Sequence, residues 1–310
     1  MDLEAFMRGI RSAFLLATAL IWIATTIIDA NTALVGTTAM SFIRLDRDAK
    51  SEALAHAITA KQDLSAFSLN PSSISGLDRK QIKVHYLSYF EAISYKNIKL
   101  HAPSRLGNLS LGFGSIQYGS QVRTTQSDTA GISSGSFDNV GYSVHFGVAR
   151  SVKKIAYGTS LRYVSQTLDT QKSDAVGLNL GLQYDLVDRL KLGLAYNNIT
   201  LQKSNYDQLS AVLPEELRAG VYYRGSLFSR GLDLGVDLIS AIDSALAMAS
   251  GLQVKINPFF AIRAGYNPLS DLAPYSLGMG LSLNDMSLDF TYKPSDQFDE
   301  SYRVGFGYQF

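Results

Sequence analysis

The C-terminal stretch 301–310, SYRVGFGYQF, alternates apolar and polar residues without interruption. In an extended strand Tyr302, Val304, Phe306, Tyr308 and Phe310 lie on one side, and Ser301, Arg303, Gly305, Gly307 and Gln309 lie on the other. A soluble protein would bury the apolar row in a core, whereas a membrane barrel would turn it toward lipid. One strand does not decide between the two, so the rest of the chain must show whether the pattern repeats.

The same alternation recurs from residue 81 onward. The segments 286–293, MSLDFTYK, and 275–284, YSLGMGLSLN, each carry one apolar face and one face dominated by small or polar residues. This period of two predicts fourteen strands, near 81–90, 92–101, 107–118, 138–150, 154–167, 175–185, 189–197, 215–225, 230–240, 245–256, 259–267, 274–284, 285–293 and 301–310. Most match the roughly 9–11 residues that a tilted strand needs to cross a bilayer and exceed the roughly 5–6 usual in soluble proteins.

The connections between the expected strands differ at the two ends. They are tight after the fourth, sixth, eighth, tenth and twelfth strands, and longer after the third, fifth, seventh, eleventh and thirteenth, as in 119–137 and 198–214. Outer-membrane barrels have short periplasmic turns, long outer loops and an even strand count. A soluble sandwich or two domains is the alternative, but fourteen strands around one core leave a space that side chains do not fill. The sequence therefore predicts an all-β, 14-stranded antiparallel transmembrane β-barrel over residues 81–310, in the outer membrane of a Gram-negative bacterium.

The first 30 residues do not follow the alternating pattern of the strands. Residues 13–28, AFLLATALIWIATTII, form an apolar run behind Arg8 and Arg11, with small residues at Ala30 and Ala33 where a peptidase could cut. This arrangement is typical of an export signal. A membrane-anchor helix is the alternative, but the run is shorter than the roughly 20 residues that such a helix needs. We therefore expect a signal peptide over residues 1–30.

Composition excludes several classes of function. The formal net charge is +1 and the basic residues are scattered, so nucleic acid is not an expected partner. The chain has no Cys and four His, and neither a metal site nor a cofactor is expected. His145 and Ser143 share the inward face of one strand, but no third partner completes a hydrolase site, so enzymatic activity is not expected.

Charged side chains fall on the face opposite the apolar rows. The polar residues expected to line the lumen are His145, Arg162, Arg218, Arg224, Asp233, Asp237, Arg263, Asp289 and Arg303. Both signs of charge occur, so the lumen is not expected to be an ion filter of one sign. Pairing of these charges across the wall is favoured over contact with a ligand.

The segment before the first strand carries a series of short motifs. Phe42, Ile43 and Ala49 are followed by Ala53, Ala57 and Ala60, and then by Ala66, Asn70 and Pro71. This series resembles the N-terminal signature of the PorV/PorQ family, which is itself similar to FadL-type transporters of hydrophobic compounds. Lys50 stands in place of the common Arg, and Ser72 in place of the Ala that usually follows Asn-Pro. The final Phe310 resembles the signal by which outer-membrane barrels are recognised for assembly.

A plug inside the barrel is expected before the first strand. Residues 46–60, DRDAKSEALAHAITA, have apolar residues at helical spacing, and Asn70 with Pro71 predicts a rigid turn. The family resemblance implies that residues 31–80 form a short N-terminal helical plug segment, with Ala66, Asn70 and Pro71 as its motif. A tail that stays outside in the periplasm is the alternative.

The resemblance implies two functions. The first is an accessory component of type IX protein secretion, whose partners are secretion-system subunits or secreted cargo beside membrane lipid. The alternative is FadL-like passive transport of hydrophobic small molecules across the outer membrane. A purely structural or adhesive barrel is a third class, and it would have a filled lumen without a partner.

Overall fold

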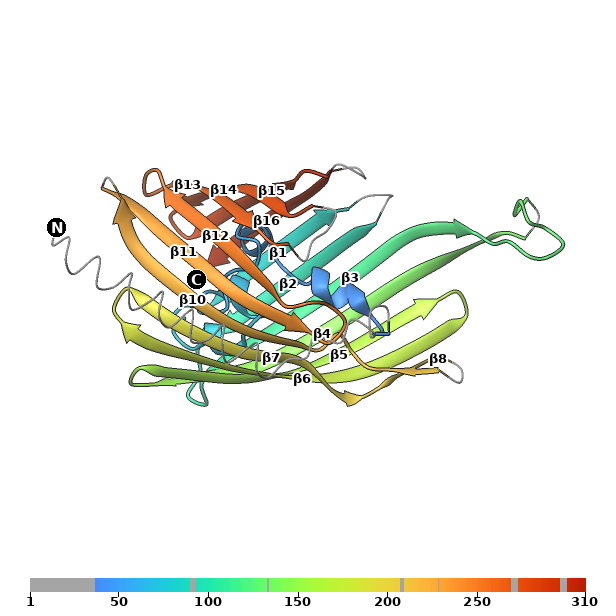
Figure 1. Ribbon diagram of the computed structural model, residues 1–310, viewed down its shortest axis with the longest axis horizontal. Helices are drawn as coiled ribbons and strands as arrows, with labels where there is room; N and C mark the ends of the chain where they lie inside the picture. The colour runs from blue at the N-terminus through green and yellow to red at the C-terminus, as the bar shows by residue number, and fades with distance from the viewer. Residues whose placement is uncertain are drawn as a thin grey trace.

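Fourteen antiparallel strands close into a barrel (Figure 1). The computed structural model describes residues 37–89, 93–132, 134–206, 209–227, 229–268, 273–295 and 300–310, so the predicted signal peptide lies outside the described residues. The barrel strands are β1 Gln81–Ser88, β2 Ser94–Ala102, β3 Asn108–Val122, β4 Ser136–Val152, β5 Ile155–Leu168, β6 Gln171–Val187, β7 Leu190–Gln202, β10 Glu216–Leu227, β11 Arg230–Ala241, β12 Ala247–Lys255, β13 Phe260–Tyr266, β14 Tyr275–Leu283, β15 Met286–Lys293 and β16 Ser301–Gln309. The prediction of a 14-stranded antiparallel barrel is confirmed.

Two hairpins extend the barrel at the long-loop end (Figure 1). β3 and β4 continue to pair as far as Val122 with Ser136, so the expected loop 119–137 shortens to 123–135. In the connection from β7 to β10, β8 (Ser204–Tyr206) and β9 (Leu209–Ala211) form a separate two-stranded sheet. The connection from β5 to β6 is only the pair 169–170, shorter than expected, because pairing continues to Leu168 with Gln171.

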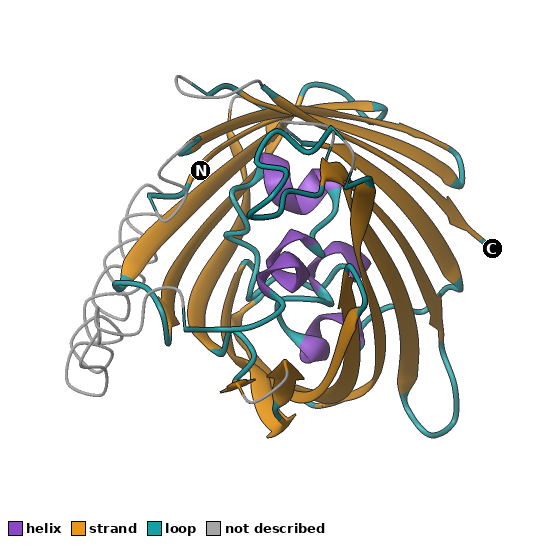
Figure 2. Cartoon of the chain, turned by 90° about the vertical axis from the view of Figure 1, so that its right-hand side faces the viewer, coloured by secondary structure: helices purple, strands orange, loops and turns teal. Residues whose placement is uncertain are grey.

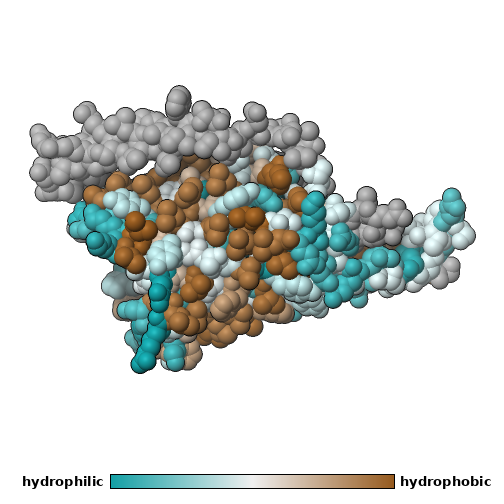
Figure 3. Space-filling view, turned by 90° about the horizontal axis from the view of Figure 1, so that it is seen from below, coloured by the Kyte–Doolittle hydropathy of each residue, from teal (hydrophilic) through white to brown (hydrophobic). Residues whose placement is uncertain are grey.

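The exterior of the barrel is apolar. On β16, Tyr302, Val304 and Phe306 are 40%, 43% and 45% exposed, whereas Ser301 and Arg303 are buried on the inner side. Figure 3 shows hydrophobic side chains over the body of the barrel and hydrophilic ones on the projecting end. The polar row faces inward and the apolar row faces outward, which is the reverse of a soluble core. A closed barrel with this exterior belongs in a bacterial outer membrane, because closure leaves no unpaired strand edge in hydrocarbon.

Aromatic rings mark both ends of this apolar band. Tyr266 and Tyr275 lie 5.2 Å apart between ring centroids, and Tyr292 and Tyr302 lie 5.5 Å apart, at the ends of strands joined by the longer loops. At the short-turn end Phe310 packs edge-on against Tyr308, 4.8 Å away, and its amide donates to Lys80 O at 2.9 Å. The last residue of the chain therefore joins the aromatic belt that membrane barrels place at the lipid–water interface.

Residues 38–80, here called the plug, run through the lumen (Figure 2). Near its start Ala39 N donates to Val212 O at 2.9 Å, at the long-loop end. The plug contains four short helical segments, η2 Ser41–Leu45, α2 Ala49–Ala53, η3 Leu64–Ala66 and η4 Pro71–Ile74. At the short-turn end the Asn108 side chain donates to the carbonyl oxygens of Ile74, Ser75 and Leu77 at 2.8–2.9 Å.

The helix expected over 46–60 is much shorter than predicted. Asp48 caps it by accepting a hydrogen bond from Ser51 N, and it ends at Ala53. Ala55 and His56 then take positive φ angles of 49° and 63°, which an α-helix does not allow. The wall compensates, because Arg218 donates to His56 O at 2.8 Å. No helix among the described residues is long and apolar enough to cross a membrane.

Candidate functional site: the plugged lumen

Glycines line the lumen where the plug backbone passes. A Cβ atom at Gly235 would lie 1.8 Å from Ala57 O, and one at Gly181 would lie 2.0 Å from Asn70 Oδ1. Cβ atoms do not approach other atoms so closely, so the plug backbone fits at these two positions only because both residues are glycine. The same close approach of plug atoms occurs at Gly158, Gly193, Gly251, Gly265 and Gly278. The inner wall is therefore shaped to the plug.

The motif residues Ala66, Asn70 and Pro71 organise the lower plug, and Asn70 also joins it to the wall. Asn70 is fully buried; its Nδ2 donates to Thr59 O at 2.8 Å and to Leu182 O at 3.2 Å. Its Oδ1 accepts from Ser72 N at 3.0 Å and from Ser72 Oγ at 2.7 Å. Ala66 O accepts from Asn70 N at 2.8 Å, and Pro71 is the first residue of η4.

Two of the predicted lumen cations bind plug carboxylates. Arg162 donates to Asp46 at 3.0 Å, and Arg303 forms an ion pair with Glu52 at 2.9 Å. Lys293 also lies 2.9 Å from Glu52. Burial opposes the charge on Glu52, but Lys293, Arg303 and the neighbouring His56 outweigh it and hold the pKa of Glu52 well below the usual 4.5. These pairs fix the plug to the wall rather than linking wall residues to one another.

Other predicted residues pair within the wall. Arg218 has no exposed surface and binds Glu216 at 2.8 Å and Asp237 at 3.0 Å. Arg263 binds Asp289 at 2.6 Å.

Asp233 and Arg224 lie toward the short-turn end. Asp233 accepts from Gln253 Nε2 at 2.8 Å and lies 3.7 Å from plug Lys61. The Arg224 side chain is 59% exposed and lies 3.7 Å from Asp233, so it sits at the rim rather than inside the lumen.

His145 contacts Ser160 rather than Ser143. Arg162 donates to His145 Nδ1 at 3.1 Å, and His145 Nε2 lies 2.6 Å from Ser160 Oγ and 3.1 Å from Asn179 Nδ2. The ring also stacks on Phe67 with centroids 4.3 Å apart. A catalytic histidine needs an acceptor at its second nitrogen to stabilise its cation, and here that position faces an arginine. Within the described residues no three His, Asp or Glu side chains are placed to share a metal ion.

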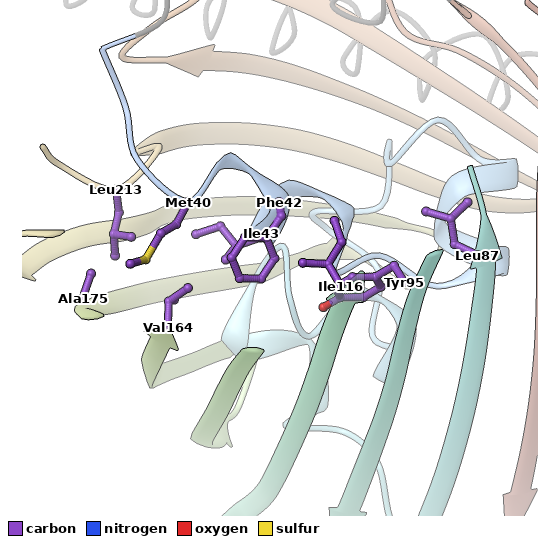
Figure 4. Close-up of a cluster of buried hydrophobic side chains, with 9 residues drawn as sticks. All are labelled: Met40, Phe42, Ile43, Leu87, Tyr95, Ile116, Val164, Ala175 and Leu213. Atoms are coloured by element: carbon purple, nitrogen blue, oxygen red, sulfur yellow. The ribbon is translucent and has the colours of Figure 1, made fainter. Parts of the chain in front are cut away.

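Large apolar side chains of the inner wall gather at the long-loop end. On β1 the inward residues run from Lys83 and His85 to Leu87, and on β5 from Arg162 to Val164. We call the buried residues Leu87, Tyr95, Ile116, Val164, Ala175 and Leu213 the apolar patch (Figure 4).

The plug covers this patch with Met40, Phe42 and Ile43 (Figure 4). The Phe42 ring rests on Gly141, where a Cβ atom would be 2.7 Å from Phe42 Cε1. Reasoning from sequence named only polar lumen residues and missed the patch. The signal for the patch in the sequence was an apolar residue on the otherwise polar face of several strands, near the end of each strand.

Comparisons with known proteins establish the fold. No protein-family model matches the chain, and no curated protein matches it. The Ralstonia pickettii toluene transporter TbuX is 12% identical, with a TM-score of 0.59 over 85% of this chain and 98% of that one. The CymD monoaromatic hydrocarbon channel is 14% identical, with a TM-score of 0.57 over 85% and 97%. A Pseudomonas aeruginosa FadL homologue is 12% identical, with a TM-score of 0.54 over 85% and 98%.

The chain thus has the fold of a 14-stranded outer-membrane β-barrel, similar to that of the FadL homologue and of TbuX. Identities this low carry the fold alone, and the finer resemblance to PorV and PorQ stays a prediction.

Proposed function

We propose that this protein is a passive outer-membrane channel that admits apolar small molecules at its long-loop end. The apolar patch is the observation that carries the proposal, because large apolar side chains of the wall gather there, at the long-loop end of the lumen. Small-molecule sites are mostly apolar concave surfaces with a few polar groups. The similar structures include a monoaromatic hydrocarbon channel and a toluene transporter, which agrees with this chemistry.

The upper plug is the part that must move. Residues 40–43 occupy the patch, so an apolar ligand reaches it only by displacing them. Their segment is tied down by Ala39 N to Val212 O and by the pair of Arg44 with Asp243. The lower plug is held by the hydrogen bond from Asn70 to Leu182 O and by the glycine-lined wall. Burial of the ligand on the patch, worth about 25 cal/mol per Å² of apolar surface, offsets the loss of the Met40 and Phe42 contacts.

A reversible lock on the upper plug tests the proposal. Thr38 and Val212 form a β-bridge, and the chain has no cysteine of its own, so Thr38→Cys with Val212→Cys introduces a single disulfide. The protein is expressed in cells whose outer leaflet is lipopolysaccharide, and uptake of radiolabelled toluene is measured. Oxidation is expected to reduce uptake to the level of cells without the protein, and a reductant is expected to restore it.

The matched control places a disulfide elsewhere in the barrel. Ser282→Cys with Ser287→Cys bridges a paired position of the β14–β15 hairpin and leaves the plug untouched, so uptake should not change. Equal uptake by the locked and the reduced protein, with the disulfide shown by gel mobility, would contradict the proposal.

Support of type IX protein secretion is a second candidate function. The β3–β4 hairpin extends well beyond the barrel rim and offers a hydrophilic surface to a subunit or cargo (Figures 1 and 3). Deleting the gene should then change the secreted proteome, and trimming the hairpin tip at 123–135 should reproduce this change without affecting toluene uptake. Unchanged secretion in both strains would argue against this role.

A further inference from the structure

Two neighbouring turns at the short-turn end carry positive charge without a balancing carboxylate. They join β2 to β3 and β4 to β5, and residues 102–108 and 149–160 contain no Asp or Glu. Within the part of the chain that the structure describes, no carboxylate forms an ion pair with the four exposed cations of these turns. We call these cations the basic rim: Arg105, Arg150, Lys153 and Lys154.

The next turn along the barrel does not offset this charge. It joins β6 to β7, and its Asp185 is bound to Lys191. Asp188 is followed directly by the exposed Arg189. The basic rim therefore keeps its positive charge among its neighbours.

Arg150 links the two turns and is held in place by the backbone. Its Nε donates to Leu106 O and its Nη2 to Arg105 O, both at 2.9 Å. Gly107 makes room for this contact, because a Cβ atom there would lie 2.8 Å from Arg150 Cγ. A guanidinium has five N–H donors, so Arg150 keeps donors for an acceptor outside the chain.

The basic rim is continuous with the lipid-facing band. On β4 Arg150 has the same parity as Phe146 and Val152, which are 50% and 57% exposed on the outer face. Leu106 and Ile155, beside the cations in the two turns, are 76% and 46% exposed. Cations interleaved with exposed apolar side chains at the edge of such a band are placed at the level of lipid headgroups. Figure 3 shows a hydrophilic edge beside the hydrophobic body at this end of the barrel.

The opposite end of the lipid-facing band presents carboxylates instead. Tyrosine hydroxyls hold them there: Tyr163 donates to Asp174 at 2.7 Å, Tyr196 to Glu215 at 2.8 Å and Tyr302 to Glu300 at 3.1 Å. Cations near these groups are paired, as in Lys172 with Asp174 and Arg123 with Asp169. An anionic headgroup is therefore attracted to the short-turn end.

We propose that the basic rim binds the phosphate of an anionic phospholipid in the leaflet on the short-turn side, with the acyl chains beside Val152 and Ile155. Arg150 supplies donors in a fixed direction, and Lys153 and Lys154 supply point charges. The site lies on the outer surface, so it does not depend on the proposed channel function.

Electron spin resonance of spin-labelled lipids tests the assignment on the full-length protein in phosphatidylcholine vesicles. The fraction of label immobilised at the protein is compared for phosphatidylglycerol, which is anionic, and for phosphatidylcholine, which has no net charge. A cation near an anionic lipid surface strengthens association roughly fivefold. The unaltered protein should prefer phosphatidylglycerol by at least that factor, and added salt should weaken the preference.

A triple variant removes three charges of the basic rim without removing a hydrogen bond of a side chain. It combines Arg105→Gln, Lys153→Gln and Lys154→Gln, and Arg150 keeps its two carbonyl partners. This variant should lose most of the preference. The matched control combines Arg123→Gln, Lys172→Gln and Lys203→Gln, which removes the same charge at the long-loop end. The control should retain the preference.

Four results would overturn the proposal. The first is equal association of the two lipids with the unaltered protein, whether or not the variants fold. The second is a preference that persists in the triple variant, shown to be folded by its heat-dependent gel mobility. The third is an equal loss in the control, which would assign the effect to net charge. The fourth is binding of heparin that the triple variant loses while its lipid preference stays, which would assign the basic rim to a soluble polyanion.

Discussion

Replacing Asn70 with Ala is expected to release the lower plug while leaving the barrel intact. The buried side chain makes four hydrogen bonds, to Thr59 O, to Leu182 O and two from Ser72. The bond to Leu182 O joins the plug to the wall, and the other three lie within the plug, so all four are lost when the lower plug leaves the wall and unfolds. A net contribution of about 1 kcal/mol for each bond gives about 3–4 kcal/mol for this opening. Since about 1.4 kcal/mol is a tenfold change, the population with the lower plug open should rise by a factor of roughly 150 to 700.

Hydrogen exchange and conductance measure this directly. Peptides covering 59–75 should exchange faster by that factor in Asn70→Ala, whereas peptides from β3 and β4 should not change. Brief openings should also become more frequent in planar bilayers. Asn139→Ala is the control, because Asn139 lies on β4 outside the plug and its side-chain carbonyl accepts one hydrogen bond, from Gln166 at 3.1 Å.

Unchanged exchange over 59–75 in the Asn70→Ala protein would refute the reasoning. It would mean that the plug is retained by its shape alone and that these four bonds do not contribute to docking. Faster exchange across the barrel strands as well would mean that plug and barrel unfold as one unit.

Three further predictions concern the wall, the plug charge and the lipid face. Gly235→Val puts a side chain where Ala57 O lies, so the plug should be displaced and the conductance should rise with the barrel still folded. Gly112→Ala is the control, because its Cβ has no neighbour nearer than 3.6 Å, and it should leave the conductance unchanged. The folded-state pKa of Glu52 is depressed, so its contribution to plug docking is complete above about pH 4.5 and is lost as pH falls through the folded pKa. Hydrogen exchange of the plug should therefore accelerate in acid. The acceleration should be smaller in Glu52→Gln, which has no carboxylate to protonate at this position. Phe146 is 50% exposed on the outer face, and Phe146→Arg should destabilise the barrel by up to about 2–4 kcal/mol in urea unfolding from lipid vesicles; no loss in vesicles would mean that this face does not meet lipid.

The sequence predicted the barrel because its signal is local and repeated. Each strand carries its own alternation of apolar and polar residues, as 286–293 and 301–310 do, and each reports independently which face meets lipid. Even the short turns could be placed, because Asn284 with Asp285 interrupts two such strands. The strand limits mostly shifted by a few residues, chiefly where pairing continues beyond the membrane, as at Val122 with Ser136.

The contents of the lumen followed less directly from the sequence. Polar residues on the inward face could be assigned from the alternation of side chains along each strand, but their interaction partners could not be predicted. Arg162 meets Asp46, 116 positions away, and His145 meets Ser160 on the next strand rather than Ser143 on its own. The helical spacing over 46–60 predicted a helix that ends at Ala53, because the space left by the wall turns the backbone at Ala55 and His56.

By itself the sequence determined the strand count, the closed antiparallel barrel and the side that faces lipid, since these depend on which neighbouring residues alternate. Only the tertiary structure decided the path of the plug, the apolar patch beneath Phe42 and the ion pairs of Glu52 with Lys293 and Arg303. The physical reason is that the lumen brings together residues from many strands and from the plug. Its chemistry depends on the register and closure of the whole barrel, which no single segment encodes.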